Sequence, residues 1–85
     1  MLVVNIPNVT NDVTGNCKYL CSIMEPYTPY TIVGQHGNRM IAYGFTYTKS
    51  EDTNYALFIY SHISDENLHL VRCYNGEWHT VNLVK

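Results

Sequence analysis

A cysteine and a histidine are the residues of this chain best suited to covalent chemistry. Cys17 follows Gly15 and Asn16 at a possible helix start, where the helix dipole lowers the pKa of a thiol and favours the nucleophilic thiolate. His36 lies in a predicted turn and could accept a proton as the base, which would make a minimal cysteine hydrolase. The competing interpretation, which we favour, is that Cys17 and Cys21 are small apolar core residues on a helix.

Two histidines and an asparagine form a second candidate group. In the strand register derived below, His62, His69 and Asn82 lie side by side on three neighbouring strands. Two imidazoles at that separation could bind a transition metal, but a protein metal site normally needs a third or fourth ligand. The nearby candidates are Asp65 and Glu66. We therefore interpret His62 and His69 as half-exposed strand residues and predict no metal and no cofactor.

An aromatic cluster is the third group and the candidate binding site. Phe58, Tyr60, Val71, Cys73 and Trp78 share one face of the predicted sheet. If the helix covers the opposite face, these side chains form an open apolar patch, which marks a contact site. If the helix covers this face, they belong to the core. The sequence leaves both arrangements open, and we take Phe58, Tyr60, Val71 and Trp78 as candidate binding residues.

Two apolar stretches in the middle of the chain have a pattern known from one enzyme family. Residues 37–45 read Gly-Asn-Arg-Met-Ile-Ala-Tyr-Gly-Phe, and residues 55–60 read Tyr-Ala-Leu-Phe-Ile-Tyr. Over residues 34–62 the chain resembles the C-terminal sheet of papain-like cysteine peptidases of the C39-like type. In that family a Gly-His pair opens an apolar strand that ends in a Tyr-Gly-aromatic run. The following aromatic strand ends near an Asp or Asn that orients the histidine.

The residues that carry the chemistry of that family are not retained. The position of the catalytic histidine falls on Asn38, and an amide cannot act as a general base. The position of the orienting carboxylate falls on Ser61. The family's domain is also much longer, because a helical half carries its nucleophile. The resemblance therefore implies a peptidase-like sheet without peptidase chemistry, as in an inactive remnant or a binding module.

Strands make up most of the predicted structure around these residues. One short helix is predicted over Cys17 to Met24, capped by Thr14 or Asn16 and ended by Pro26. Gly44 in the middle of a strand indicates a bulge, a bend or close backbone packing. The predicted strands are Leu2 to Ile6, Tyr30 to Val33, Arg39 to Thr48, Tyr55 to Ile63, Leu68 to Tyr74 and Glu77 to Val84. We predict a single α+β domain over residues 1–85, with a mainly antiparallel meander sheet of about five strands and one N-terminal helix.

The dipeptide Asn75-Gly76 is the clearest local signal in the chain. A two-residue hairpin turn of type I′ needs a positive φ at both central positions, which Asn and Gly tolerate best. The turn fixes the register of the strands on either side of it. The predicted pairs are Tyr74 with Glu77, Cys73 with Trp78, Arg72 with His79, Val71 with Thr80, Leu70 with Val81, His69 with Asn82 and Leu68 with Leu83.

A second, longer turn sets the register of the preceding strand. If Ser64–Asn67 is a four-residue loop, Ile63 lies opposite Leu68 and His62 lies opposite His69. The alternation of side chains then separates an aliphatic face from the aromatic one. We predict that the aliphatic face is the core, and its members are Leu57, Ile59, Ile63, Leu68, Leu70, Val81 and Leu83.

Composition restricts the function classes. The 85 residues include 5 Lys+Arg and 7 Asp+Glu, giving a formal net charge of -2. Without a basic block, binding to a nucleic-acid backbone is unfavourable. The start of the chain has neither a basic region nor a long apolar stretch, so we expect no secretion signal and no membrane contact. The three cysteines, an odd number, fit a reducing compartment, and we predict a cytoplasmic protein.

The sequence as a whole favours a non-enzymatic interaction module. We expect it to dock onto a protein partner or a second copy of itself, through the aromatic sheet face or an edge strand. Its small size and its 8 tyrosines are typical of compact inhibitors such as those encoded by phages and mobile elements. The alternatives from other classes are the hydrolase with Cys17 and His36 and a small-ligand binder using the aromatic face.

Overall fold

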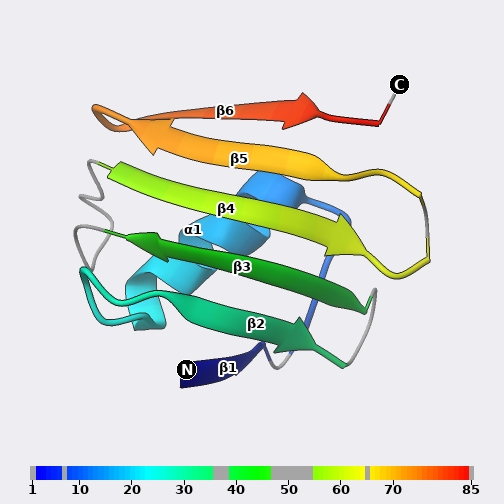
Figure 1. The fold of residues 1–85 in the computed structure, drawn as a ribbon, viewed down its shortest axis with the longest axis horizontal. Helices are drawn as coiled ribbons and strands as arrows, with labels where there is room; N and C mark the ends of the chain where they lie inside the picture. Colours follow the sequence, from blue (N-terminus) through cyan, green and yellow to red (C-terminus); the bar gives the residue numbers. More distant parts are fainter. Residues whose placement is uncertain (1, 7, 36–38, 47–54, 65, 85) are drawn as a thin grey trace.

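The part of the chain that the structure describes folds into one sheet with a single helix on one side of it (Figure 1). The structure is a computed structural model that describes residues 2–6, 8–35, 39–46, 55–64 and 66–84. Within these residues the predicted α+β class with one N-terminal helix is confirmed, and the sheet has six strands rather than about five. The elements are β1 (Leu2–Ile6), α1 (Val13–Ile23), β2 (Tyr30–Gly34), β3 (Met40–Thr46), β4 (Tyr55–His62), β5 (His69–Tyr74) and β6 (Glu77–Asn82).

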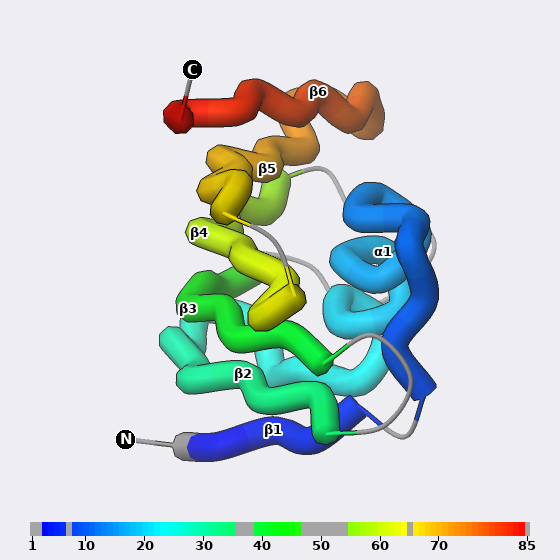
Figure 2. The backbone as a smooth tube through the Cα atoms, turned by 90° about the vertical axis from the view of Figure 1, so that its right-hand side faces the viewer, coloured from blue at the N-terminus to red at the C-terminus, as the bar shows by residue number. Residues whose placement is uncertain are grey.

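The strands lie side by side in chain order, and one pair departs from the predicted meander. β2 to β6 are antiparallel to their neighbours, whereas β1 runs parallel to β2. A parallel pair cannot be joined by a tight turn, because the chain must return to the end where the first strand began. Helix α1 makes this return across the sheet (Figure 2). The helix is therefore both the connection between β1 and β2 and the layer that covers one face.

Helix α1 begins one turn earlier than predicted. Its cap is Asp12, whose carboxylate accepts a hydrogen bond from the backbone N–H of Gly15 at 3.0 Å. Thr14 and Asn16, the predicted caps, lie within the helix. At the other end Met24 caps the helix two residues before Pro26, as the proline predicts.

The hairpin between β5 and β6 has the predicted geometry. Asn75 and Gly76 have φ angles of 52° and 82°, and Cys73 pairs with Trp78. The register between β4 and β5 differs from the prediction: His69 pairs with Tyr60 and not with His62. The connection between these strands is longer than four residues, since β4 ends at His62 and β5 begins at His69. Because the shift is of two residues, each side chain stays on the face that alternation assigned to it.

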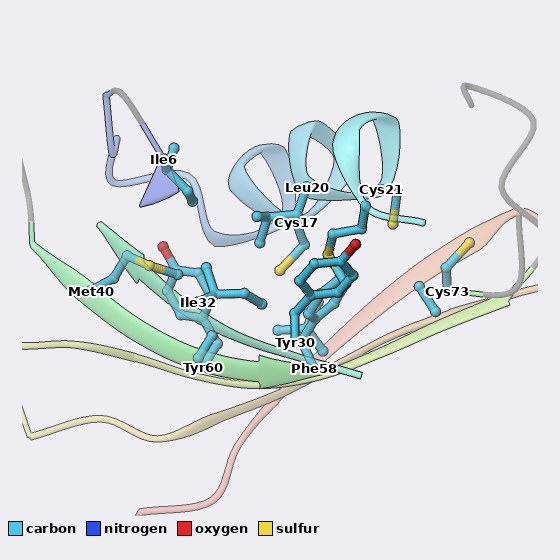
Figure 3. Close-up of a cluster of buried hydrophobic side chains, with 14 of the residues drawn as sticks. Ile6, Cys17, Leu20, Cys21, Tyr30, Ile32, Met40, Phe58, Tyr60 and Cys73 are labelled. Carbon is cyan, nitrogen blue, oxygen red and sulfur yellow. The ribbon is translucent and has the colours of Figure 1, made fainter. Parts of the chain in front are cut away.

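The prediction that the aliphatic face is the core is wrong. Helix α1 packs on the aromatic face, where Phe58 and Tyr60 are fully buried (Figure 3). Val71 on the same face is fully buried too. Ile59 and Val81, which were assigned to the core, are exposed on the opposite face. The buried hydrophobic residues are Ile6, Val9, Cys17, Leu20, Cys21, Met24, Tyr30, Ile32, Met40, Ala42, Ala56, Phe58, Tyr60, Val71 and Cys73.

Small residues give the large rings of the core face their space. Gly44 is paired with Phe58, and a Cβ added to it would lie 2.2 Å from the carbonyl oxygen of Leu57 and 2.5 Å from Cδ1 of Phe58. The pairing of β3 with β4 is continuous across Gly44, so the glycine marks close packing and not a bulge. Ala42 and Ala56 are the other small, buried residues of these two strands.

The two glycines Gly44 and Gly76 should respond differently to the same change. Gly44→Ala should lower the free energy of unfolding by about 3 kcal/mol, because backbone atoms of β4 must move to admit the methyl group. Gly76→Ala should cost about 1 kcal/mol from its positive φ alone, since its Cβ would meet nothing within 4 Å. Urea unfolding of both variants gives the comparison, and equal losses would show that β3 and β4 do not approach this closely at Gly44.

Candidate functional site

The structure places the predicted nucleophile in the hydrophobic core. Cys17 lies on the sheet side of α1 and is fully buried against the core cluster (Figure 3). Burial, followed by the charges of Cys21 and Asp12, raises the pKa of the Cys17 thiol. The helix dipole favours a thiolate only within the first turn of a helix. Because α1 begins at Val13, Cys17 lies beyond that turn. His36, the predicted base, lies outside the described residues.

The other two thiols are buried as well. Cys21 and Cys73 form no disulfide and are buried. Burial also raises the pKa of Cys73. A buried, protonated thiol is a small apolar packing group rather than a nucleophile. The interpretation of Cys17 and Cys21 as core residues is confirmed.

The two histidines each lie next to Tyr60 and are not direct strand partners: His62 follows it on β4, and His69 is its partner on β5. The ring centroids of His62 and His69 lie 5.1 Å and 6.4 Å from that of Tyr60. Asn82 is paired with His69 as predicted, but its amide donates to the side chain of Asn67 at 2.8 Å. Within the described residues, no group of three or more His, Cys, Asp or Glu side chains could hold a metal ion. The candidate ligand Asp65 is outside the part of the chain that the structure describes.

Asn16 is the centre of a buried polar cluster that sequence reasoning did not identify. Its Nδ2 donates to the carbonyl of Thr10 at 3.0 Å and to the Tyr60 hydroxyl. Its Oδ1 accepts from the Thr10 hydroxyl at 3.1 Å. His62 Nε2 lies 3.1 Å from both the Thr10 carbonyl and the Tyr60 hydroxyl. Because a carbonyl oxygen can only accept, Nε2 carries the proton in this arrangement.

This cluster joins three parts of the fold and leaves little free capacity for a ligand. Thr10 belongs to the connection after β1, Asn16 to α1, and Tyr60 and His62 to β4. Asn16 and His62 are each only 5% exposed. A buried polar group whose partners are satisfied holds its neighbours in one arrangement, since breaking any one bond leaves an unpaired group. We therefore assign these side chains to the positioning of α1 on the sheet.

The face of the sheet opposite α1 holds the remaining candidate site. One residue from each strand forms a line across it, and each is the direct partner of the next. We call this line the transverse row; its members are Val3, Thr31, Tyr43, Ile59, Leu70 and Val81. No helix among the described residues covers it (Figure 2). Ile59, in the central strand β4, is 48% exposed.

The surface around the transverse row is apolar too. Ile41 next to it is 52% exposed, and Phe45 and Leu57 are half-buried on its other side. A shallow, open hollow of about 240 Å³ lies between β2, β3, β4 and the start of β5. Leu68 contributes to its wall, together with Ile41, Tyr43 and Ile59. These apolar side chains are neighbours on the solvent side of the sheet, so they form one group rather than scattered exposure.

Within its six strands, this face carries charged side chains only toward one corner. Within the six strands its charged members are Arg72 and Glu77. The Arg72 guanidinium lies 5.2 Å from the ring centroid of Tyr74. Oε1 of Glu77 lies 3.9 Å from Nε2 of His79. The transverse row itself has no charged residue. The centre of the face is therefore mostly apolar, and the charged side chains of its strands lie toward one corner.

The structure places the predicted binding residues in the core or against it. Phe58, Tyr60 and Val71 are fully buried beneath α1, and Trp78 is partly buried against the same core. They are core residues, and the exposed patch predicted for this face is wrong. The surface that the sequence assigned to the core is the one left open. The alternation of side chains along the strands grouped the residues of the open face correctly. The small residues Ala42 and Gly44 on the other face were the signal that could have shown which face the helix covers.

The Tyr60 hydroxyl should contribute measurably to stability. Tyr60→Phe should lower the free energy of unfolding by about 2 kcal/mol, because Asn16 and His62 each lose a buried partner. Tyr43→Phe is the matched control, because this ring lies on the open face, and its effect should stay within about 0.5 kcal/mol. Denaturant unfolding measures both, and equal effects would contradict the role of the cluster.

The same two variants should differ in how their stability depends on pH. Burial raises the pKa of Tyr60 to about 12, above the value of the unfolded chain. The stability from this group is present below about pH 10 and is lost as the pH rises toward 12. Tyr60→Phe should lack this part of the alkaline loss, and Tyr43→Phe should retain it.

The cysteines should be inert in the folded protein. At about pH 8 iodoacetamide should modify none of the three quickly, because each is buried and the thiols of Cys17 and Cys73 are held protonated. In urea all three should react. Mass spectrometry of the labelled protein gives the site and the rate. Fast, selective alkylation of Cys17 in the native state would contradict the core assignment and restore the hydrolase hypothesis.

Comparisons with known proteins give no relative for this arrangement. No family model matches the chain, and searches of the curated proteins and of the solved structures give no match. The resemblance to papain-like peptidases thus stays a prediction. Asn38 and Ser61 occupy the positions at which that family has its catalytic histidine and orienting carboxylate. Asn38 is outside the described residues. Ser61 lies on β4, where its hydroxyl donates to the carbonyl of Asn67 at 3.1 Å.

Proposed function

We propose that this chain is a non-enzymatic interaction module that docks a protein partner through the helix-free face of its sheet. The observation that carries the proposal is the transverse row, an uncharged and mostly apolar line across all six strands. An antiparallel sheet with one face in water ordinarily carries polar side chains there. Here the exposed positions of the central strands include Ile41, Tyr43 and Ile59.

The residue types suit docking onto a protein. The side chains of Ile59 and Val81 are branched at Cβ, so they lose little rotamer freedom when a partner covers them. Tyr43 adds a large ring with a polar tip, the kind of side chain enriched at interfaces. The docking residues of this proposal are therefore Tyr43, Ile59, Leu70 and Val81. They replace the aromatic residues of the core face.

A protein partner fits the surface better than a small ligand does. The hollow of about 240 Å³ is open and shallow. Sites for small molecules are usually concave cavities of about 300–1,000 Å³ that enclose most of the ligand. A broad apolar surface with its polar groups at the rim instead matches the anatomy of protein interfaces.

The proposal includes a place and a mode of action. Three buried thiols, none of them in a disulfide, suit a reducing compartment, and we assign the chain to the cytoplasm. No helix in the described residues is long and apolar enough to cross a membrane. A module of this size acts by occupying the surface that it docks onto, as compact inhibitors of the phage and mobile-element type do.

A photo-crosslinking amino acid at position 59 tests the proposal directly. In cells of the natural source it should form a covalent adduct with a protein that mass spectrometry identifies. The matched control carries the same group at position 23, which is 37% exposed on α1 on the other side of the molecule. Adducts at position 59 and none at position 23 support the helix-free face. The absence of any adduct at position 59 overturns the proposed function.

A further inference from the structure

We propose that the occupant of the helix-free face is a second copy of this chain, packed sheet against sheet. The inference rests on the proposed function, because it names the partner of the same surface. In the resulting dimer the transverse rows of the two copies face each other, and the helices lie on the two outer sides. Each sheet would then be covered on both faces.

Shape is the first argument for a second copy. Strands twist with one hand, so two copies of the same sheet have matching twist. Two such sheets pack face to face at about -30°, roughly 10 Å apart, with their side chains interdigitated. The open face meets this requirement, because the strands β2 to β5 carry half-buried or exposed aliphatic and aromatic side chains toward it. A partner of unrelated shape would have to supply a surface of the same curvature.

Area is the second argument. The molecule measures 30 × 26 × 21 Å along its principal axes, and the sheet lies across the two longer ones (Figure 1). A face with sides of 30 and 26 Å is close to the roughly 800 Å² that each partner buries in an interface of standard size. The face is therefore large enough for an interface of standard size with a second copy.

Charge is the third argument. Two identical faces repel each other if they carry charge of one sign, and the chain has a formal net charge of -2. The transverse row has no charged residue, and the corner holds both signs in Arg72 and Glu77. These groups would lie at the rim, where they remain hydrated. Self-association through the row therefore brings no buried like-charge pair.

The symmetry of this arrangement limits its growth. In a two-fold interface both copies use the same patch, so the contact closes after two molecules. The contact uses side chains of the sheet face and no backbone pairing along the edge strands β1 and β6. Pairing through an edge strand instead would leave the apolar faces in water and would not change when Ile59 is altered.

Sedimentation of the purified protein over a wide concentration range tests the inference. We expect a species of twice the 9.8 kDa chain mass that dissociates on dilution. Ile59→Lys, at the centre of the row, should weaken the dimer by about thirtyfold or more, the usual scale of a central interface residue. Ile23→Lys is the matched control on α1 and should leave the dimer unchanged. Tyr43→Lys is a second variant in the row, and circular dichroism confirms that each variant is folded.

The outcomes separate this inference from the proposed function. A monomer at every concentration, or a dimer that neither Ile59→Lys nor Tyr43→Lys weakens, overturns the second copy. If the crosslinker at position 59 then captures a different protein, the docking function stands and only its occupant was wrong. A dimer lost in both row variants and kept in Ile23→Lys supports the second copy, as does an adduct at position 59 between two chains of this protein.

Discussion

One helix of 11 residues cannot cover both faces of a six-stranded sheet, and the choice of face determines everything else in this structure. Packing α1 against Phe58, Tyr60 and Val71 makes these the core and gives Cys17 a buried, protonated thiol. The same choice leaves Ile59 and its neighbours in the transverse row open. Core, loss of cysteine chemistry and candidate interface are thus consequences of one packing event.

Two physical features select the face that the helix covers. The first is volume, because Gly44, Ala42 and Ala56 leave room for the large rings and for the helix side chains above them. The second is hydrogen bonding, because the buried amide of Asn16 requires partners and donates to Thr10 and Tyr60 on this face. If α1 packed on the aliphatic face, this amide would lose the Tyr60 hydroxyl, and each group left unpaired would cost about 1–3 kcal/mol.

The sequence predicted what depends on neighbouring residues. Pleat alternation, the stop at Pro26 and the turn at Asn75-Gly76 are local, so the strands, the end of the helix and the last hairpin register could be derived. The face that the helix covers depends on contacts between Asn16 and Tyr60, 44 residues apart, for which no local pattern exists. The parallel pairing of β1 and the length of the β4–β5 connection are likewise set by tertiary packing. The same holds for the candidate site. Local alternation grouped its residues on one face correctly, but the prediction assigned that face to the core instead of to the surface.

The apolar character of both faces has a thermodynamic consequence. A side chain such as Ile59 or Val81 gains little from the fold while it is exposed, and an apolar sheet face in water promotes unselective association. Polar residues at these positions would remove that hazard at little cost to the core, because the open face makes no contact with α1. An antiparallel sheet with one face in water usually carries polar side chains on that face, and the apolar side chains at the centre of this one depart from that pattern. The helix supplies one cover, and the proposed second copy supplies the other, which makes association part of the stability of the folded chain rather than an addition to it.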